Sequence, residues 1–114
     1  MTKIDFTSFG IIIVDGREYK HDIIIDYKGK IKEAKTKIRH LFSKDEFEEL
    51  AKENPEIIIV GNGQYSAMKI DEEVKKIAKE RKIELIILPT SEAIEKFNEL
   101  VESKKVCAYF HITC

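Results

Sequence analysis

In the first third of the chain, apolar residues either alternate with polar ones or form short β-branched runs, as they do in β-strands. Residues 4–7 (IDFT) alternate, and residues 11–14 (IIIV) form a run that ends at Asp15-Gly16. An Asp-Gly pair favours the type I′ turn of a two-residue hairpin. A second run at residues 23–25 is followed by another turn-forming segment, residues 27–30. This region is therefore predicted to form two antiparallel β-hairpins.

Further along, apolar runs alternate with stretches in which apolar residues recur every three or four positions. Ser43 and Glu46 have the spacing of a capping box, which predicts a helix that begins at residue 44. Asp71 is predicted to cap a second helix, and residues 89–91 (PTS) lead into a third helix. The apolar runs predicted to be strands are residues 57–60, 83–88 and 106–113. Three alternations of strand and helix are typical of parallel strands joined by crossover helices.

Composition limits the size of the protein and the kinds of partner it has. The chain of 114 residues is long enough for one hydrophobic core, so we expect a single domain over residues 1–114. Its 20 Lys and Arg nearly balance its 21 Asp and Glu, and this net charge of −1 provides no overall field that attracts nucleic acid or a membrane.

The many lysines and glutamates are typical of ion-pair networks in thermophilic proteins. The sequence shows no signal-like segment and no apolar run of about 18 residues, so we expect a cytoplasmic protein without a membrane span.

Residues 60–70 (VGNGQYSAMKI) carry two glycines directly after an apolar run, which suggests a phosphate-binding loop. In a dinucleotide-binding loop, however, the strand turns directly into a helix. Here Ser66 occupies the third glycine position, and Asp71 would place a negative charge at the N-terminus of the helix. The absence of a Gly-Lys-Ser/Thr ending excludes a P-loop. We therefore interpret Gly61 and Gly63 as residues that allow a tight backbone turn.

Two loops, residues 61–66 and residues 89–91, nevertheless lie where α/β sheets bind ligands, outside the carboxyl ends of parallel strands. The residues predicted to line one crevice there are Gly61, Asn62, Gly63, Gln64, Tyr65, Ser66, Thr90 and Ser91. They offer hydrogen-bonding groups but no general acid or base. These groups suit a polar or anionic small ligand, and we predict no catalytic residue.

Residues 111–114 (HITC) suggest a metal site or a Cys-His pair, but strand alternation argues against both. Residues three apart in a strand point to opposite faces, so His111 and Cys114 would separate. One histidine and one cysteine also fall short of the three or four ligands that zinc takes. Seven strand steps would hold Cys107 and Cys114 about 23 Å apart, which excludes a disulfide between them. We expect no metal and no cofactor, and the sequence leaves the roles of His21, His111 and Cys114 open.

Basic residues are concentrated in one segment, at Lys28, Lys30, Lys32, Lys35, Lys37 and Arg39. Lysines on an exposed edge strand prevent one sheet from adding to another. Basic residues on one face of an extended segment also suit binding to the phosphate backbone of a nucleic acid. However, no aromatic residues alternate with these lysines to stack on the bases. Edge protection is therefore the favoured interpretation, and nucleic acid is not an expected partner.

Several separated segments together resemble one known family. They are residues 7–10 (TSFG), His21-Asp22, residues 61–69, Pro89-Thr90 with Phe97-Asn98, and residues 111–114. In these segments the chain resembles the small single-domain proteins that include the adipogenesis-associated domain protein of animals, the mitochondrial complex I assembly factor three, and many archaeal and bacterial members. Ser66 stands where many of these relatives carry glycine.

The resemblance implies an α/β fold of three layers. These are a central mixed sheet with one antiparallel strand, helices on its faces, and an additional layer of N-terminal β-hairpins; we assign the antiparallel strand to residues 106–113. Because the mitochondrial member resembles an assembly partner rather than a catalyst, the resemblance implies a non-catalytic protein-interaction or assembly-factor-like role. Its target would be a protein partner or a second copy of the chain. The alternative is a small-molecule-binding protein or enzyme that uses the crevice of residues 61–66 and 89–91.

Overall fold

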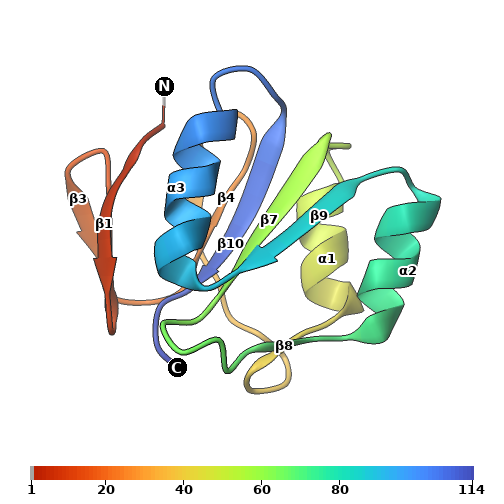
Figure 1. Cartoon of the computed structure of the whole chain (residues 1–114), viewed down its shortest axis with the longest axis horizontal. Helices are drawn as coiled ribbons and strands as arrows, with labels where there is room; N and C mark the ends of the chain where they lie inside the picture. Colours follow the sequence, from red (N-terminus) through yellow and green to blue (C-terminus); the bar gives the residue numbers. More distant parts are fainter. Residues whose placement is uncertain (1) are drawn as a thin grey trace.

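A computed structural model describes residues 2–114, and within them the chain forms three helices and ten strands (Figure 1). The helices are α1 (Lys44–Ala51), α2 (Glu72–Glu80) and α3 (Thr90–Leu100). The strands are β1 (Ile4–Ser8), β2 (Ile11–Val14), β3 (Arg17–Tyr19), β4 (Ile23–Ile25), β5 (Ile31–Glu33), β6 (Leu41–Phe42), β7 (Ile57–Asn62), β8 (Lys69–Ile70), β9 (Glu84–Leu88) and β10 (Val106–His111). No helix within residues 2–114 is long and apolar enough to cross a membrane.

The central sheet has five strands in the order β5-β4-β10-β7-β9. β10 lies in its middle, parallel to β7 and antiparallel to β4, and β9 is parallel to β7. β5 is antiparallel to β4, so β4 runs opposite to the four other strands of this sheet. The mixed sheet with one antiparallel strand is therefore confirmed.

The assignment of the antiparallel strand to residues 106–113 is wrong. β10 follows α3, and a crossover helix returns the chain in the direction of the preceding parallel strand. β4 is instead joined to β5 by a tight turn, in which the Asp26 side chain accepts hydrogen bonds from the backbone N–H groups of Lys28 and Lys30, both at 2.9 Å. A short connection of this kind forces antiparallel pairing.

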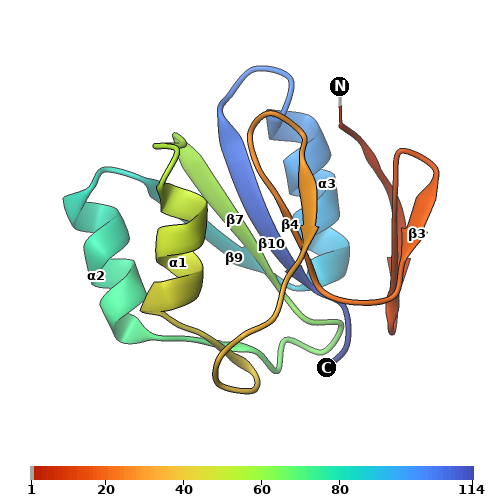
Figure 2. The ribbon, with the colours of Figure 1, turned by 180° about the vertical axis from the view of Figure 1, so that it is seen from behind.

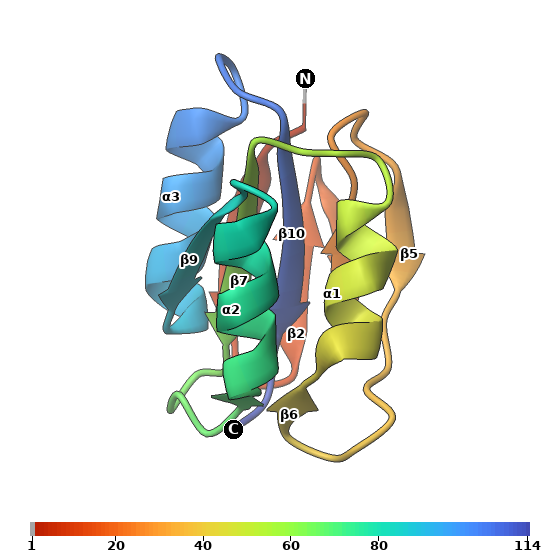
Figure 3. The ribbon, with the colours of Figure 1, turned by 90° about the vertical axis from the view of Figure 1, so that its right-hand side faces the viewer.

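The central sheet is covered on both faces, which confirms the three-layer arrangement. α1 and α2 lie against one face, whereas α3 and the separate sheet β1-β2-β3 cover the other (Figures 1 and 2). In Figure 3 the central strands are seen between α3 on one side and α1 on the other. Of the two predicted hairpins, the one at Asp15-Gly16 belongs to the additional layer, while β4 and β5 became part of the central sheet.

Alternation along β10 divides its side chains between two cores. Ala108 and Phe110 belong to the core under α3 and the N-terminal sheet, and Cys107 and Tyr109 belong to the core under α1 and α2. All six residues of β10 are buried. A strand covered on both faces needs apolar side chains on both sides, which explains why β10 is a nearly continuous apolar run rather than an alternating pattern.

The predicted helix starts are confirmed by local contacts. The Glu46 carboxylate accepts a hydrogen bond from the Ser43 backbone N–H at 2.7 Å, and the Asp71 carboxylate accepts one from the Glu73 N–H at 3.0 Å. α3 begins at Thr90, directly after Pro89. Thr90 and Ser91 therefore lie in the first helical turn and not in the preceding loop.

Candidate functional site

Most of the segments that resemble the family meet at one end of the central sheet, where β7 and β10 end. We call this region the strand-end cluster, and it comprises residues 7–10, 22, 61–68, 90 and 109–114. Phe97 and Asn98 lie further along α3, where Asn98 bonds to Ile4 of β1. The Gly10 N–H donates to the Ile112 carbonyl at 2.8 Å, and the Gln64 side chain donates to Thr7 Oγ1 at 2.9 Å and to the Ser8 carbonyl at 3.0 Å. These contacts join the β1–β2 turn, the twin-glycine loop and the C-terminal segment into one unit.

The Asp22 carboxylate is a hydrogen-bond acceptor for three groups of the C-terminal segment. Its Oδ2 accepts from the Tyr109 hydroxyl at 2.9 Å and from His111 Nδ1 at 2.8 Å. Its Oδ1 accepts from the Ile112 backbone N–H at 2.9 Å. Asp22 directly precedes β4, and the pairing of β4 with β10 brings it to these partners. The arrangement satisfies a largely buried charge with three donors.

The Tyr109 hydroxyl is held in its neutral form. Burial, followed by the negative charge of Asp22, raises the pKa of Tyr109 well above its ordinary value. The hydroxyl therefore remains protonated and continues to donate its hydrogen bond to Asp22.

His111 is oriented by Asp22, but its surroundings do not resemble a working nucleophile site. Because Nδ1 donates to Asp22, Nε2 faces the hydroxyl of Thr113, at 3.4 Å, beyond the usual hydrogen-bond range of about 3.2 Å. The His111 side chain is only 8% exposed, and the His40 ring packs edge-on against it with 5.4 Å between ring centroids. The carboxylate–imidazole pair thus fits a structural clamp on the C-terminal segment better than a hydrolase triad.

Both glycines of the twin-glycine loop allow a close approach of other chain segments. Gly63 has a φ of +113°, and a Cβ there would overlap the main-chain carbonyl group of Cys114. Gly61 lies within β7, where a Cβ would lie 3.0 Å from side-chain atoms of Phe110 and Thr90. Of these two glycines, Gly63 is the one that needs a positive φ, whereas Gly61 is needed because a side chain there would crowd its neighbours.

The backbone amides of this loop are already engaged by the C-terminal segment. The N–H of Gln64 donates to the Thr113 carbonyl at 2.7 Å, and those of Tyr65 and Ala67 donate to the main-chain oxygen of Cys114 at 2.9 and 3.0 Å. A dinucleotide-binding loop would present such N–H groups to a pyrophosphate. Here they fasten the loop to the rest of the protein.

Thr90 fills the junction between the two sides of the predicted crevice. It is fully buried, and its hydroxyl accepts from the Gly63 N–H at 2.9 Å and donates to the His111 carbonyl at 2.6 Å. The Thr90 N–H also donates to the Gly63 carbonyl at 3.0 Å. Thr90 therefore links α3, β10 and the twin-glycine loop.

The structure brings the predicted ligand-binding residues together but exposes them unequally. Gly61, Gly63 and Thr90 are buried, Asn62 and Gln64 are half-buried, and Tyr65, Ser66 and Ser91 are exposed. The side-chain oxygen Oδ1 of Asn62 is buried and has no hydrogen-bond partner among residues 2–114.

Two exposed aromatic side chains project from the strand-end cluster, and we call Phe9 and Tyr65 the aromatic tip. Phe9 is 56% exposed and Tyr65 is 77% exposed, and their ring centroids are 6.1 Å apart. Phe9 comes from the β1–β2 turn, and Tyr65 comes from the twin-glycine loop. Gln64, which bonds to Thr7 and Ser8, holds these two turns together.

Sequence reasoning missed several of these groupings. Strand alternation places Tyr109 and His111 on one side of β10, but Asp22 joins them only because β4 pairs with β10. His40 also reaches His111, whereas His21 points elsewhere and packs against Tyr19. The available signal for Phe9 was its position beside Gly10, between the alternating residues 4–7 and the apolar run of residues 11–14.

The fold and the site define a class of small three-layer α/β domains whose C-terminal strand is clamped by a largely buried aspartate. Residues 4–111 match the family described as "Protein of unknown function (DUF498/DUF598)", and the chain belongs to that family. This confirms the family resemblance of the separated segments.

Solved structures of similar proteins support the same assignment. The conserved hypothetical protein PH1505 from Pyrococcus horikoshii OT3 is 32% identical, with a TM-score of 0.89 over 98% of this chain and 99% of that chain. The protein MT938 is 29% identical, with a TM-score of 0.85 over the whole of both chains. A Mth938-like domain from Bordetella pertussis is 14% identical with a TM-score of 0.62 over 97% of this chain and 85% of that chain, and it shows the shared fold alone.

Proposed function

We propose that this protein is a non-catalytic protein-interaction domain with an assembly-factor-like role in the cytoplasm, and that it binds its protein partner through the aromatic tip. The observation that carries the proposal is the exposure of Phe9 and Tyr65, which come from two distant parts of the chain and lie side by side. Aromatic residues are enriched at the energetic centres of protein interfaces.

The surroundings of the aromatic tip favour binding in two ways. The adjacent Thr7, Ser8 and Ser66 are uncharged polar residues of the kind found at an interface rim. The hydrogen bonds of Gln64, together with those from the twin-glycine loop to the C-terminal segment, hold both turns in place. Binding to a site held in this way has a smaller entropic cost, because little of it must be ordered when the partner arrives.

The proposal is tested by affinity capture from a lysate of the source organism with quantitative mass spectrometry. The wild-type protein is compared with a Phe9→Ala/Tyr65→Ala variant and with the control variant Ile38→Ala, since Ile38 is an apolar side chain that is 58% exposed elsewhere on the chain. We expect one stable partner to be captured by the wild type and the Ile38→Ala variant and to be lost from the double variant. A partner retained equally by all three proteins, or no stable partner at all, would count against the proposal.

A second copy of the chain is the alternative protein partner. Light scattering of the purified protein distinguishes this case, because the chain alone has a mass of 13.2 kDa. Self-association that disappears in the Phe9→Ala/Tyr65→Ala variant would assign the aromatic tip to a homo-oligomer interface.

The second candidate function is binding of a small polar molecule by residues 61–66 and 89–91. It is favoured by one observation, the buried Asn62 Oδ1 without a partner within the described chain. Native mass spectrometry of protein purified without added cofactors tests it. We expect an additional bound mass in the wild type that an Asn62→Leu variant loses, and a wild-type protein without bound mass would contradict it.

A further inference from the structure

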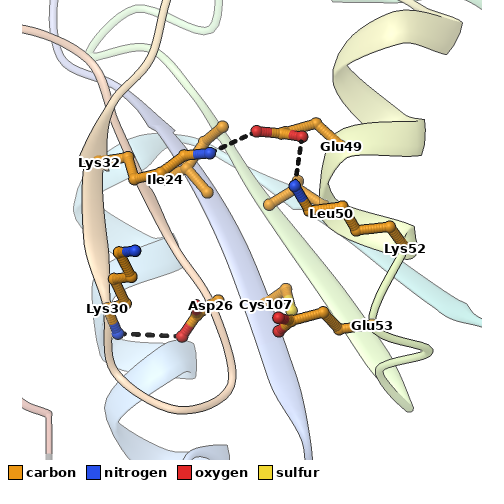
Figure 4. A pocket seen from close by; sticks show the side chains of 9 residues that line it. All are labelled: Ile24, Asp26, Lys30, Lys32, Glu49, Leu50, Lys52, Glu53 and Cys107. Carbon is orange, nitrogen blue, oxygen red and sulfur yellow. Dashed lines mark hydrogen bonds and ion pairs between the residues drawn. The ribbon is translucent and has the colours of Figure 1, made fainter.

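A cavity of about 150 Å³ lies between the β4–β5 hairpin and α1, toward the opposite end of β10 from the strand-end cluster (Figure 4). Ile24 and Leu50 contribute apolar surface, and Cys107 of β10 lies between the hairpin and the helix. The six remaining lining residues are charged. Five of them form two groups of opposite character, and the sixth, Lys30, lies on the hairpin, where its backbone N–H donates to Asp26 (Figure 4).

The first group is anionic and consists of Asp26 and Glu53, which lie beside the Cys107 thiol (Figure 4). The Glu53 oxygen Oε2 is buried and has no hydrogen-bond partner in the part of the chain that the structure describes. A buried carboxylate oxygen without a donor is energetically unfavourable, and a bound donor would remove this penalty. Burial raises the pKa of Cys107 to about 11, so the neighbouring thiol remains neutral at ordinary pH and adds no third negative charge.

The second group is cationic and is organised by Glu49. Lys32 Nζ donates to Glu49 Oε1 at 2.5 Å, and Lys52 Nζ donates to Glu49 Oε2 at 3.0 Å. The hydrogen bond with Glu49 raises the pKa of Lys32, and the hydrogen bonds with Lys32 and Lys52 lower the pKa of Glu49. Two ammonium groups thus stand beside one carboxylate, which leaves a positive excess, and each ammonium retains donors for another acceptor.

We propose that this cavity binds a small zwitterion, with the ligand's ammonium group at Glu53 and Asp26 and its carboxylate at Lys32 and Lys52. The volume supports this choice, because a cavity of about 150 Å³ holds a molecule roughly the size of benzene. An α-amino acid or a short ω-amino acid is of this size, whereas a nucleotide is too large. This site is separate from the aromatic tip and does not depend on the proposed protein partner.

The test is a titration of the ¹⁵N-labelled protein followed by NMR. The zwitterionic probes are glycine, β-alanine, γ-aminobutyrate and 5-aminovalerate, which separate the two charges by increasing lengths. Acetate and methylammonium are the single-charge controls. We expect at least one zwitterion to cause saturable shifts of the Glu53 and Cys107 amide signals, with affinity at least about tenfold higher than either single-charge probe.

Variants then test which residues bind the ammonium group of the ligand and which bind its carboxylate. Glu53→Gln and Lys52→Gln are each expected to weaken binding of that zwitterion about tenfold, since each removes a charge-assisted contact. The control variant is Glu80→Gln, because Glu80 is exposed on α2 and forms no ion pair within the described residues; it should bind as the wild type does. Lys52 is 59% exposed, so Lys52→Gln keeps the test decisive even if Glu53→Gln unfolds.

Three results would overturn the proposal. They are the absence of saturable shifts with all four zwitterions, equal binding of the single-charge probes, and unchanged affinity in folded Glu53→Gln and Lys52→Gln variants. The Phe9→Ala/Tyr65→Ala variant should bind the zwitterion normally, so failure of this site and failure of the proposed protein-binding function can be told apart.

Discussion

Gly63 is a single residue on which the packing of the C-terminal segment depends. Its φ of +113° is unfavourable for other residues, and its missing Cβ leaves room for the main chain of Cys114. The two effects can be separated with Gly16, which also has a positive φ, +81°, but where an added Cβ would have no neighbouring atom within 4 Å.

We expect Gly63→Ala to lower the free energy of unfolding by about 3 kcal/mol, because it combines backbone strain with a steric clash. Gly16→Ala should lower the free energy of unfolding by only about 1 kcal/mol, because backbone strain is present there without a steric clash. Urea denaturation followed by circular dichroism measures both values. Equal losses would show that the close approach of Cys114 is not the reason for glycine at position 63.

Asp22 should matter more than any one of its donors. An Asp22→Asn variant keeps one acceptor oxygen but turns an amide N–H₂ group toward another donor, and we expect a loss of about 3 kcal/mol of stability. Tyr109→Phe removes a single donor and should cost about 1 kcal/mol. Chemical denaturation of both variants measures the two losses of stability. A loss in Tyr109→Phe as large as that in Asp22→Asn would argue against Asp22 as the common acceptor of the three donors.

Cys107 should make the protein less stable in alkali. Burial raises its pKa from 9.0 to about 11 in the folded state, so between these values the unfolded chain loses the thiol proton while the folded chain keeps it. Ionisation of the thiol then favours unfolding. The buried, protonated thiol therefore contributes its full share to stability below pH 9, and this share is lost as the pH rises toward 11. We expect stability measured by urea denaturation to fall more steeply over this range in the wild type than in Cys107→Ala. Parallel curves would contradict this assignment.

At the scale of elements, α3 holds the N-terminal sheet through one side chain. Asn98 Oδ1 accepts a hydrogen bond from the Ile4 N–H, and Asn98 Nδ2 donates one to the Ile4 carbonyl, both at 2.8 Å. Asn98 thus bonds to β1 as a neighbouring strand would. This pair of contacts, together with packing of Ile4 and Phe97 in one core, fixes the third layer on the helix.

An Asn98→Asp variant should loosen this attachment, because a carboxylate cannot donate to the Ile4 carbonyl. We expect faster hydrogen exchange of the β1 amides and a loss of about 1–2 kcal/mol of stability, while amides within α3 keep their protection. Glu95→Gln, an exposed change on the same helix, is the matched control and should exchange as the wild type does. Uniformly faster exchange over the whole chain would instead indicate global destabilisation.

The elements differ in how far they could be predicted, because only some of their determinants are local. The starts of α1 and α2 were predictable, since Ser43 with Glu46 and Asp71 with Glu73 are neighbours in sequence. The Asp15-Gly16 turn was predictable for the same reason, and both residues have positive φ. The direction of β4 relative to β10 was not predictable, because it depends on a pairing between segments about 85 residues apart.

At the scale of the whole molecule, two cores share the same central strands. One core contains Ile57 and Ile59 of β7 and the other contains Ile58 and Val60, so neither core can be disrupted without disturbing β7. The expectation of a single domain therefore becomes a prediction about cooperativity.

We expect one two-state unfolding transition. Far-ultraviolet circular dichroism follows the backbone. Tyrosine fluorescence follows the surroundings of the four tyrosines, of which Tyr109 lies in the core under α1 and α2. The two thermal transitions should coincide, and separate midpoints would contradict a single cooperative unit.

The sequence by itself determined the class of fold, the helix starts, the tight turns and the two faces of β10. These features follow from residues close together in the chain, whose spacing and backbone preferences act locally. Only the tertiary structure decided which strand is reversed, that Asp22 meets His111, and that Phe9 meets Tyr65. Each of these meetings joins residues more than 50 positions apart, and the spacing of apolar residues along a chain does not specify which distant segments become neighbours in space.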